Sequence, residues 1–451
     1  MEKLVRIKSY VILGVMVFVC AVFTYYIMLK AGTVKNIDTA TDEMRETTIY
    51  ELSRDKTMEG TIYDRSGIAI SKADTYGDTG TLSDVAYSYL IGYNSKNYGT
   101  YGIKGLYKDY LWLHDEKKEF DDGADIEMTI RDDLQCQIYR MIEGRDAAVM
   151  VMDYRTGEIL ALVSSNKMMP FDANQIEDKY TDYAKIDGFF LSNAYRDNQP
   201  PGSVFKIVTA TAAIETGNDA FCCVDGGSVT IQGVRIRNAG GAVYGDLDLQ
   251  NALIHSSNVY FSQLALKIGS ENLQNVAEKF CLNQEIKLDF TKLSSNYDMT
   301  LNEDENEEVL LAMTGFGQGH TTISLVQLGM IMAAIANDGE MKEPHVIKNI
   351  KKNEEILYQY EDNTLVTPVS KETADKVKIL LKGVAQSYGF SSEMMAKTGT
   401  AELGKGNLAK AYLVTADNQY VVCISCKEEG IFGSNLRESV KGIYQKIYEE
   451  E

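Results

Sequence analysis

The chain has 451 residues, of which 45% are hydrophobic, so it is long enough to build more than one buried core. Its formal net charge of −20 argues against nucleic-acid binding and against a protein that lies flat on an anionic membrane surface. Its seven cysteines are an odd number, and neither they nor the four histidines have the spacing of a metal site. We therefore expect no disulfide framework, no metal and no cofactor.

The first long element is an uncharged apolar run at residues 9–29. At about 1.5 Å per residue, a helix of this length crosses the hydrocarbon core of a bilayer. Lys3, Arg6 and Lys8 precede the run, and this positive flank favours a cytoplasmic tail at residues 1–8. The sequence thus predicts a single-pass protein of the cell membrane whose main part lies outside the cytoplasm. A cleaved signal peptide is the alternative.

Two folded parts are expected after this anchor. Residues 30–143 are rich in Tyr, Asp, Gly and Lys and have short strand-like runs, so we assign them to a pedestal domain. Residues 144–451 form the second domain, in which apolar strands frame a helical middle section. Its expected elements are strands at 147–153, 158–163, 410–415 and 419–426, and helices at 204–215, 249–254, 325–336 and 436–448.

A Ser-x-x-Lys motif occurs at Ser203 and Lys206, directly after the stiff sequence Pro200-Pro201-Gly202. The helical pattern that follows places these two side chains one turn apart on one face. A serine hydroxyl is a weak nucleophile at neutral pH, and a neutral lysine can accept its proton. Ser-x-x-Lys also occurs at two other places in the chain, so the motif alone is weak. The alternative for Ser203 is a helix-capping hydroxyl beside a solvated lysine.

A neutral lysine needs a special environment, because the ordinary pKa of lysine is about 10.4. Lowering that pKa to near 7 takes roughly 4 kcal/mol of differential interaction. Burial disfavours the charged form, and a second cation close by acts in the same direction. Lys397 is the candidate for this second cation. Two lysines that lie far apart and reach into solvent are the alternative.

Two further motifs follow the first one in order. Ser256 and Asn258 are expected on a loop between two helices, where a hydroxyl can relay a proton and an amide can bind a peptide. An ordinary polar turn is the alternative for this segment. We expect the neighbouring His255 to pack rather than to catalyse.

The last motif is the single Lys-Thr-Gly of the chain, and it begins at Lys397. It is expected on a strand edge, where Gly399 allows a close approach and the hydroxyls of Thr398 and Thr400 suit a carboxylate. The backbone N–H groups of Ser203 and Thr400 are candidates for an oxyanion hole.

The three motifs together resemble those of the penicillin-binding proteins, the serine D,D-transpeptidase family. The matching flanks are Gln-Pro-Pro-Gly-Ser at 199–203, Gly-Phe-Gly-Gln-Gly at 315–319 and Lys-Thr-Gly-Thr-Ala-Glu at 397–402. Residues 153–161 look like the opening hairpin of that family. Residues 60–67 and 105–111 look like the pedestal of its class B members, in particular the PBPA-like branch. The strand at 411–416 departs from the family, which usually has a Trp-Phe pair and a glycine there.

The resemblance implies an α/β (α+β) fold in which helices flank an antiparallel sheet. It implies an enzyme that cross-links the D-Ala-D-Ala stem peptides of peptidoglycan through a serine acyl-enzyme and that β-lactams inhibit. The implied catalytic residues are Ser203, Lys206, Ser256, Asn258 and Lys397, and the implied substrate-binding residues are Thr398, Gly399 and Thr400. The resemblance also implies a membrane glycosyltransferase partner of the SEDS type. A D,D-carboxypeptidase and a non-catalytic β-lactam-binding scaffold or sensor are the alternatives.

Overall fold

The computed structural model describes residues 53–404 and 407–449. The predicted tail and membrane anchor, residues 1–29, lie outside this part of the chain, and so does Cys20. No helix among the described residues has both the length and the apolar character that a membrane crossing requires.

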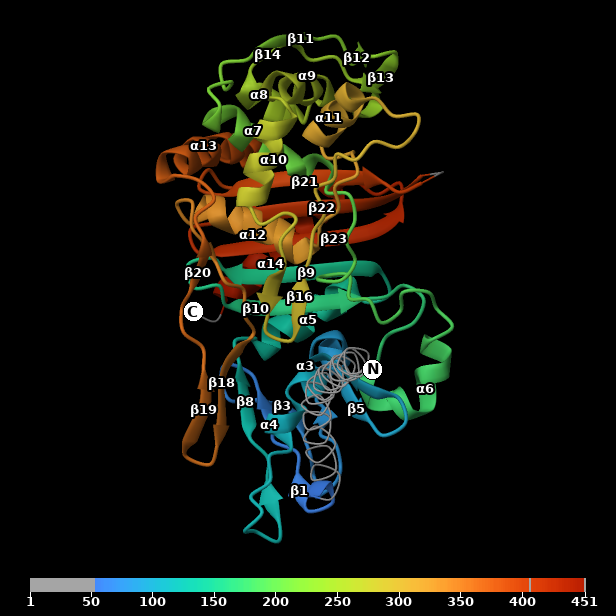
Figure 1. Cartoon of the computed structure of the whole chain (residues 1–451), viewed down its shortest axis with the longest axis vertical. Helices are drawn as coiled ribbons and strands as arrows, with labels where there is room; N and C mark the ends of the chain where they lie inside the picture. Colours follow the sequence, from blue (N-terminus) through green and yellow to red (C-terminus); the bar gives the residue numbers. More distant parts are fainter. Residues whose placement is uncertain (1–52, 405–406, 450–451) are drawn as a thin grey trace, which may run out of the picture.

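The larger of the two main sheets, counted in residues, has five long antiparallel strands in the order β10-β9-β23-β22-β21 (Figure 1). The strands are β9 (Asp146–Asp153), β10 (Ile159–Ser165), β21 (Met395–Glu402), β22 (Leu408–Ala416) and β23 (Tyr420–Glu429). The pairing of β9 with β23 joins segments from the two ends of the domain. The predicted antiparallel sheet is confirmed, and β21 lies at its edge.

Helices cover both faces of this sheet. Cys423 of β23 lies against Gly329 on one face, whereas the hydroxyl of Thr415 meets that of Tyr444 on the other at 3.2 Å. The side chains of a strand alternate between faces, and nearly every residue of these strands is buried, as expected for a sheet covered on both sides. The covering helices are α12 (Leu325–Ala336) on the first face, and α5 (Asp132–Ile142) and α14 (Arg437–Tyr448) on the second.

A group of helices stands above the edge strand β21 (Figure 1). These helices are α7 (Lys206–Glu215), α8 (Leu249–His255), α9 (Asn258–Ile268), α10 (Ser270–Lys279), α11 (Glu307–Gly315) and α13 (Lys371–Ser387). Two small strand pairs cap the group: β11 (Cys223–Asp225) with β14 (Gly245–Leu247), and β12 (Ser228–Ile231) with β13 (Val234–Arg237). The helices expected from the sequence are all present, and α12 has the predicted bounds.

The second main sheet lies in the pedestal region and has six strands in the order β19-β18-β8-β2-β3-β4. Its strands are β2 (Ile62–Tyr63), β3 (Ala69–Lys72), β4 (Thr81–Leu82), β8 (Asp125–Met128), β18 (Ile347–Lys352) and β19 (Glu355–Gln359). The hairpin of β18 and β19 comes from the second half of the chain and pairs with β8. The predicted pedestal, residues 30–143, therefore lacks this hairpin, although the hairpin pairs with the pedestal sheet.

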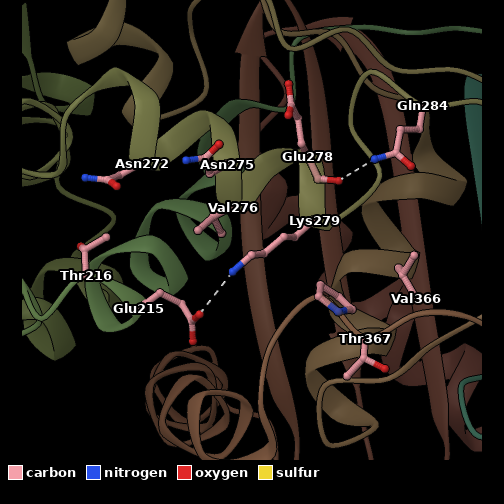
Figure 2. Close-up of a pocket in the computed structure, with 11 residues that line it drawn as sticks. Glu215, Thr216, Asn272, Asn275, Val276, Glu278, Lys279, Gln284, Val366 and Thr367 are labelled. Atoms are coloured by element: carbon pink, nitrogen blue, oxygen red, sulfur yellow. Dashed lines mark hydrogen bonds and ion pairs between the residues drawn. The ribbon is translucent and has the colours of Figure 1, made fainter.

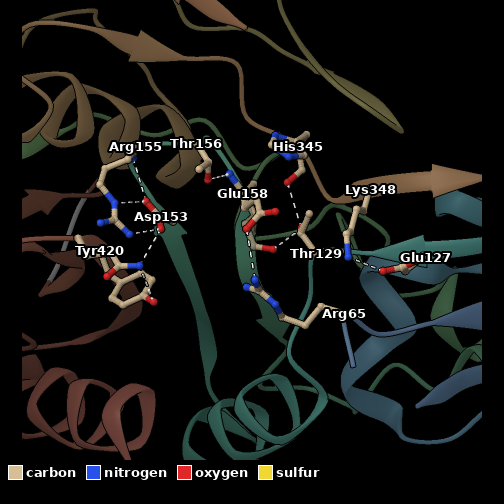
Figure 3. A network of polar contacts seen from close by, with 12 residues as sticks. Arg65, Glu127, Thr129, Asp153, Arg155, Thr156, Glu158, His345, Lys348 and Tyr420 are labelled. Carbon is tan, nitrogen blue, oxygen red and sulfur yellow. Dashed lines mark hydrogen bonds and ion pairs between the residues drawn. The ribbon is translucent and has the colours of Figure 1, made fainter. Parts of the chain in front are cut away.

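Hydrogen bonds and an ion pair tie the two sheets together, and Figure 3 shows the side chains that take part. The N–H of Ile159, at the start of β10, donates to the carbonyl of His345 at 2.9 Å. The hydroxyl of Thr129 donates to the carbonyl of Ile159 at 2.7 Å, and an ion pair of 3.5 Å joins Arg65 to Glu158. The pedestal and the larger sheet are therefore continuous at this junction.

The remaining elements are short and complete the two domains. In the pedestal they are β1 (Thr57–Met58), β5 (Tyr93–Ser95), β6 (Gly99–Tyr101), β7 (Asp121–Asp122), α2 (Ser88–Ile91), α3 (Gly102–Leu106) and α4 (Lys108–Leu111). Elsewhere they are α6 (Ile176–Tyr183), β15 (Ile286–Leu288), β16 (Thr291–Leu293), β17 (Met341–Lys342) and β20 (Thr364–Val366).

Candidate active site

Ser203 lies in a tight turn that leads into α7. Residues Gly202–Phe205 form a 3₁₀ turn, and the α-helix begins at Lys206, two residues later than the sequence predicts. Side chains three residues apart are eclipsed in a 3₁₀ turn. The Nζ of Lys206 consequently lies 3.0 Å from the Oγ of Ser203. The predicted pairing of these two residues is present, and the 3₁₀ geometry produces it.

Two glycines make this turn possible. Gly202 has a φ of +55°, and its N–H donates to the carbonyl of Gly317 at 3.1 Å. A Cβ at Gly317 would lie 1.9 Å from the carbonyl oxygen of Gly202, so no side chain fits at Gly317. The Gly-Phe-Gly-Gln-Gly segment at 315–319 therefore supports the turn that presents Ser203.

The second motif lies at the junction of α8 and α9. Ser256 ends α8 in the left-handed conformation, with a φ of +54°, and Ser257 caps α9. Asn258 is the first residue of α9, so it lies in a helix and not in the loop that the sequence predicts. The sharp reversal at Ser256 turns its carbonyl and its hydroxyl toward Lys206, at 2.7 and 3.2 Å.

A buried polar network holds this junction in place. The carboxyl group of Asp225 accepts hydrogen bonds from the hydroxyl of Ser257 at 2.5 Å and from the amide of Asn238 at 2.8 and 2.9 Å. The amide oxygen of Asn238 accepts from the N–H of Asn258 at 2.8 Å. The sequence analysis missed Asp225 and Asn238. The only local signal is a turn pattern, Asp-Gly-Gly at 225–227, which does not indicate a link to Ser257, 32 residues later.

The third motif lies on the edge strand β21. Lys397 is fully buried, and its Nζ donates to the hydroxyl of Ser256 and to the carbonyl of Thr398, both at 3.0 Å. A Cβ at Gly399 would lie 2.8 Å from a methyl group of Val204 and 3.0 Å from the carbonyl of Pro201. The close approach expected at Gly399 is thus present, and the approaching group is the turn that contains Ser203.

Five of the predicted site residues converge through direct contacts, and Lys206 is at their centre. Its Nζ lies within 3.2 Å of Ser203, of both the carbonyl and the hydroxyl of Ser256, and of the Asn258 amide oxygen, which is 2.9 Å away. The predicted substrate-binding hydroxyls do not bond to these five residues. Thr398 contacts the hydroxyl of Tyr388 at 2.7 Å, and Thr400 accepts from the N–H of Gly433 at 3.3 Å.

The two lysines lie in an environment that disfavours positive charge. Burial lowers the pKa of Lys206 well below its ordinary value, and the neighbouring cation Lys397 lowers this pKa further. Burial alone lowers the pKa of Lys397 to about 7. Within the described residues, neither lysine forms an ion pair with a carboxylate that offsets this loss of hydration. Both effects favour the neutral form of Lys206.

The partners of Lys206 match those of a neutral amine. An amine has two N–H donors and one lone pair. The carbonyl of Ser256 and the amide oxygen of Asn258 only accept hydrogen bonds, so they occupy the two donors. The lone pair is then free to accept the proton of the Ser203 hydroxyl at 3.0 Å. The arrangement suits a base that activates Ser203.

The neighbouring groups have structural roles. His255 is exposed and stacks on Tyr244, with 4.5 Å between ring centroids, which agrees with the packing role expected for it.

The six cysteines among the described residues are free, and these residues contain no cluster of metal-binding side chains. At the strand that departs from the family pattern, Tyr412 is buried opposite Gly399, and Lys410 forms a 2.7 Å ion pair with Asp197.

A surface hollow lies at the opposite end of α7 from Ser203 (Figure 2). The C-terminal end of α7, helix α10 and residues 366–368 line it, and an ion pair of 3.6 Å between Glu215 and Lys279 crosses one side. None of the predicted site residues lines this hollow. The candidate active site is instead the contact region between the start of α7, the α8–α9 junction and β21.

Comparisons with known proteins agree with this geometry. The penicillin binding protein transpeptidase domain matches residues 147–448. Penicillin-binding protein 3 of Bacillus subtilis is 27% identical over 358 residues, which cover 74% of this chain and 50% of the relative. The chain thus spans half the length of this curated relative.

Two solved structures are similar in fold. The D,D-transpeptidase domain of a peptidoglycan glycosyltransferase from Eggerthella lenta has a TM-score of 0.78 and 25% identity, over 88% of this chain and 100% of that one. The imipenem acyl-enzyme complex of penicillin-binding protein A from M. tuberculosis has a TM-score of 0.76 and 20% identity, over 84% and 96% of the two chains. On the match over residues 147–448, the chain belongs to the family of penicillin-binding proteins with a transpeptidase domain.

Proposed function

We propose that this protein is a peptidoglycan D,D-transpeptidase that works through an acyl-enzyme at Ser203. The observation that supports this most directly is the buried Lys206, whose lone pair is available to Ser203 while its two N–H donors are occupied. Two comparisons support the same proposal. One relative is named a peptidoglycan D,D-transpeptidase, and one protein of similar fold was solved as an acyl-enzyme complex with imipenem. The substrate is a stem peptide that ends in D-Ala-D-Ala.

The first half of the reaction forms an ester. The Oγ of Ser203 attacks the carbonyl carbon between the two D-Ala residues, and its proton passes to the Nζ of Lys206. The proton then passes through the hydroxyl of Ser256, which contacts both lysines, to the nitrogen of the leaving D-Ala. The C–N bond breaks, and the peptide is left as an ester of Ser203.

The negative charge on the carbonyl oxygen needs donors in this step. The backbone N–H groups of Ser203 and Thr400 are suitable candidates, because a Cβ on Gly202 would lie only 3.0 Å from the nitrogen of Thr400. Each donor of this kind is typically worth about 3 kcal/mol in the transition state. In the second half, the amine of a neighbouring stem peptide attacks the ester, a new amide bond forms and the Ser203 hydroxyl is restored.

β-Lactams enter the same pathway. Their strained amide carbonyl acylates Ser203, and no leaving group departs from the site. We propose that Thr398, Gly399 and Thr400 form the strand that binds the backbone and the carboxylate of the ligand, whether the ligand is a stem peptide or a β-lactam. The close packing of Gly399 against the Ser203 turn places that strand beside the nucleophile.

The proposal also includes the location of the enzyme and its partner. The uncharged run at residues 9–29, preceded by three basic residues, supports a single membrane anchor with the enzyme outside the cytoplasm. A SEDS-type glycosyltransferase is the proposed partner, since a cross-linking enzyme acts on glycan strands that another enzyme must polymerise. Co-purification from membranes tests this partner, and its failure leaves the chemistry at Ser203 unaffected.

A labelling experiment tests the acyl-enzyme. Wild-type protein should react covalently with a fluorescent penicillin, and Ser203→Ala should not. A D-Ala-D-Ala peptide should then release D-Ala, and an added acceptor amine should divert the product from the free acid to the cross-linked peptide. Absence of labelling at high drug concentration would contradict the proposed acyl-enzyme. Hydrolysis that the amine does not divert would make the protein a carboxypeptidase, and labelling without turnover a scaffold or sensor.

A further inference from the structure

The hydroxyl of Thr398 has an unusual partner for a substrate-binding group. The hydroxyl of Tyr388 lies 2.7 Å from the Oγ1 of Thr398. Tyr388 directly follows α13, which packs beside β21 (Figure 1). Burial raises the pKa of Tyr388, so the phenol stays protonated at any physiological pH and is able to donate.

A hydrogen bond from Tyr388 would fix the direction of the Thr398 proton. A hydroxyl group has one proton, and an oxygen that already accepts from a neighbour directs that proton elsewhere. The side chain of Thr398 is partly exposed, so a ligand in the site can receive the proton. A carboxylate is the fitting ligand because it only accepts hydrogen bonds.

A guanidinium group contacts the main chain of Tyr388. Arg437 is the first residue of α14, and its side chain donates to the carbonyls of Tyr388 at 3.2 Å and Ser434 at 3.1 Å. In the described part of the chain no carboxylate neutralises it. The loop before α14 touches the substrate-binding strand directly, because a Cβ at Gly433 would lie 2.8 Å from the Cβ of Thr398.

Arg437 lies at the N-terminal end of α14, where a positive charge is unfavourable. The N-terminal end of a helix has a partial positive charge, which favours anions and disfavours a cation such as Arg437. The protein therefore keeps a cation that has no carboxylate partner among the described residues, at a helix end that disfavours it. Gly433, in the loop before this helix, packs against Thr398. An anionic ligand would relieve this unfavourable arrangement.

We propose that Tyr388 is a positioning residue that aims the Thr398 hydroxyl at the terminal carboxylate of the donor peptide or β-lactam, and that Arg437 supplies the countercharge. This inference rests on the proposed transpeptidase function and assigns specificity within that site. It makes α13 and α14 contributors to substrate choice, although neither contains one of the three sequence motifs.

The test compares two ligands that differ only in the carboxylate. Benzylpenicillin and its methyl ester should compete with a fluorescent penicillin for Ser203, and the ratio of their acylation rates measures carboxylate recognition. Tyr388→Phe and Arg437→Gln should each lower this acid-to-ester ratio by about tenfold and leave the ester rate within about twofold, as expected for loss of a hydrogen bond or charge contact to an anion. Arg437→Lys should restore part of the ratio.

The control for folding is Tyr448→Phe, which removes a tyrosine hydroxyl on α14 that bonds to Asp417 at 2.6 Å, away from the site. Its acid-to-ester ratio should equal that of wild type. An unchanged ratio in both Tyr388→Phe and Arg437→Gln, in protein that labels normally, overturns this inference and leaves the proposed function intact. Wild-type protein that neither ligand acylates overturns the proposed function itself.

Discussion

The side-chain nitrogens of Lys206 and Lys397 meet at one hydroxyl group, that of Ser256, at 3.2 and 3.0 Å. Both lysines are fully buried, and no carboxylate among the described residues pairs with either. Two positive charges so close together in a dry site repel each other strongly. The site therefore favours states in which at least one lysine is neutral, and the protonation of one depends on the other.

This coupling predicts how acylation depends on pH. Because Lys206 acts as a base only when neutral, the acylation rate should rise with pH through the lowered pKa of Lys206. Lys397→Met removes the neighbouring cation, so the pKa of Lys206 should rise and the rising limb should move to higher pH. Rates of penicillin acylation from about pH 5 to 9 provide the measurement. A limb that stays in place or moves lower would show that Lys397 does not influence the base.

The same substitution should stabilise the fold while it impairs catalysis. The pKa of Lys397 is about 7 in the folded protein and about 10.4 when unfolded, so between these values the unfolded chain binds more protons. The unfavourable contribution of Lys397 is thus complete below about pH 7 and fades as the pH rises toward 10. Lys397→Met should raise the free energy of unfolding by about 1 kcal/mol or more at pH 7, and by less at higher pH.

Urea unfolding at two pH values measures this effect, and Lys206→Met is the matched control. That substitution leaves two acceptors, the carbonyl of Ser256 and the amide oxygen of Asn258, without their donor. Lys397→Met leaves only one such acceptor, the carbonyl of Thr398. Unpaired buried acceptors destabilise a fold, so Lys206→Met should stabilise less than Lys397→Met. Equal effects of the two substitutions would argue against this account of the site.

The polar network of Asp225 and Asn238 at the α8–α9 junction should affect both the stability of the fold and the acylation rate. The two carboxyl oxygens of Asp225 accept from Ser257, Asn238 and the N–H of Gly227. Asp225→Asn places an NH₂ group against these donors and should lower the free energy of unfolding by about 1–3 kcal/mol. The junction then loses its support, so the acylation rate should fall as well.

Asp246→Asn is the control for this substitution, because Asp246 pairs with Val224 on the neighbouring strand and is exposed. It should change neither property appreciably. Unfolding free energies and penicillin acylation rates of the two variants decide the question. An Asp225→Asn protein that acylates at the wild-type rate would show that the junction holds its geometry without the network.

The sequence was most informative where a local pattern determines the structure. The apolar runs at 410–415 and 419–426 predicted β22 and β23, and the proline-glycine turn before Ser203 predicted the start of a helix. The motif spacing identified five residues that the structure brings into contact. Gly399 was expected at a close approach, and the Ser203 turn is indeed packed against it.

Features that depend on distant pairing were not predictable in this way. The hairpin of β18 and β19 joins the pedestal sheet through β8, more than 200 residues earlier in the chain, and no local pattern records such a pairing. Asp225 and Asn238 reach Ser257 only because β11 and β13 fold over α9. The 3₁₀ turn at Ser203 depends on Gly317, which packs against Gly202 from another segment.

The junction between pedestal and larger sheet should weaken in acid because of His345. This residue is buried against Tyr360, with 3.4 Å between ring centroids, and burial lowers its pKa to about 4. Its unfolded pKa is about 6.5, so the unfolded chain binds more protons between these values, and stability is lost as the pH falls from about 6.5 to 4.

His345→Phe keeps an aromatic ring on Tyr360 and removes the titration. Relative to wild type, the variant should gain stability as the pH falls from about 6.5 to 4, by as much as about 3 kcal/mol. The neighbouring Asp289, whose pKa burial raises to about 6, titrates in the opposite sense, but it is present in both proteins and cancels in the difference. A difference between His345→Phe and wild type that stays constant from about pH 6.5 to 4 would place the acid sensitivity of the fold elsewhere.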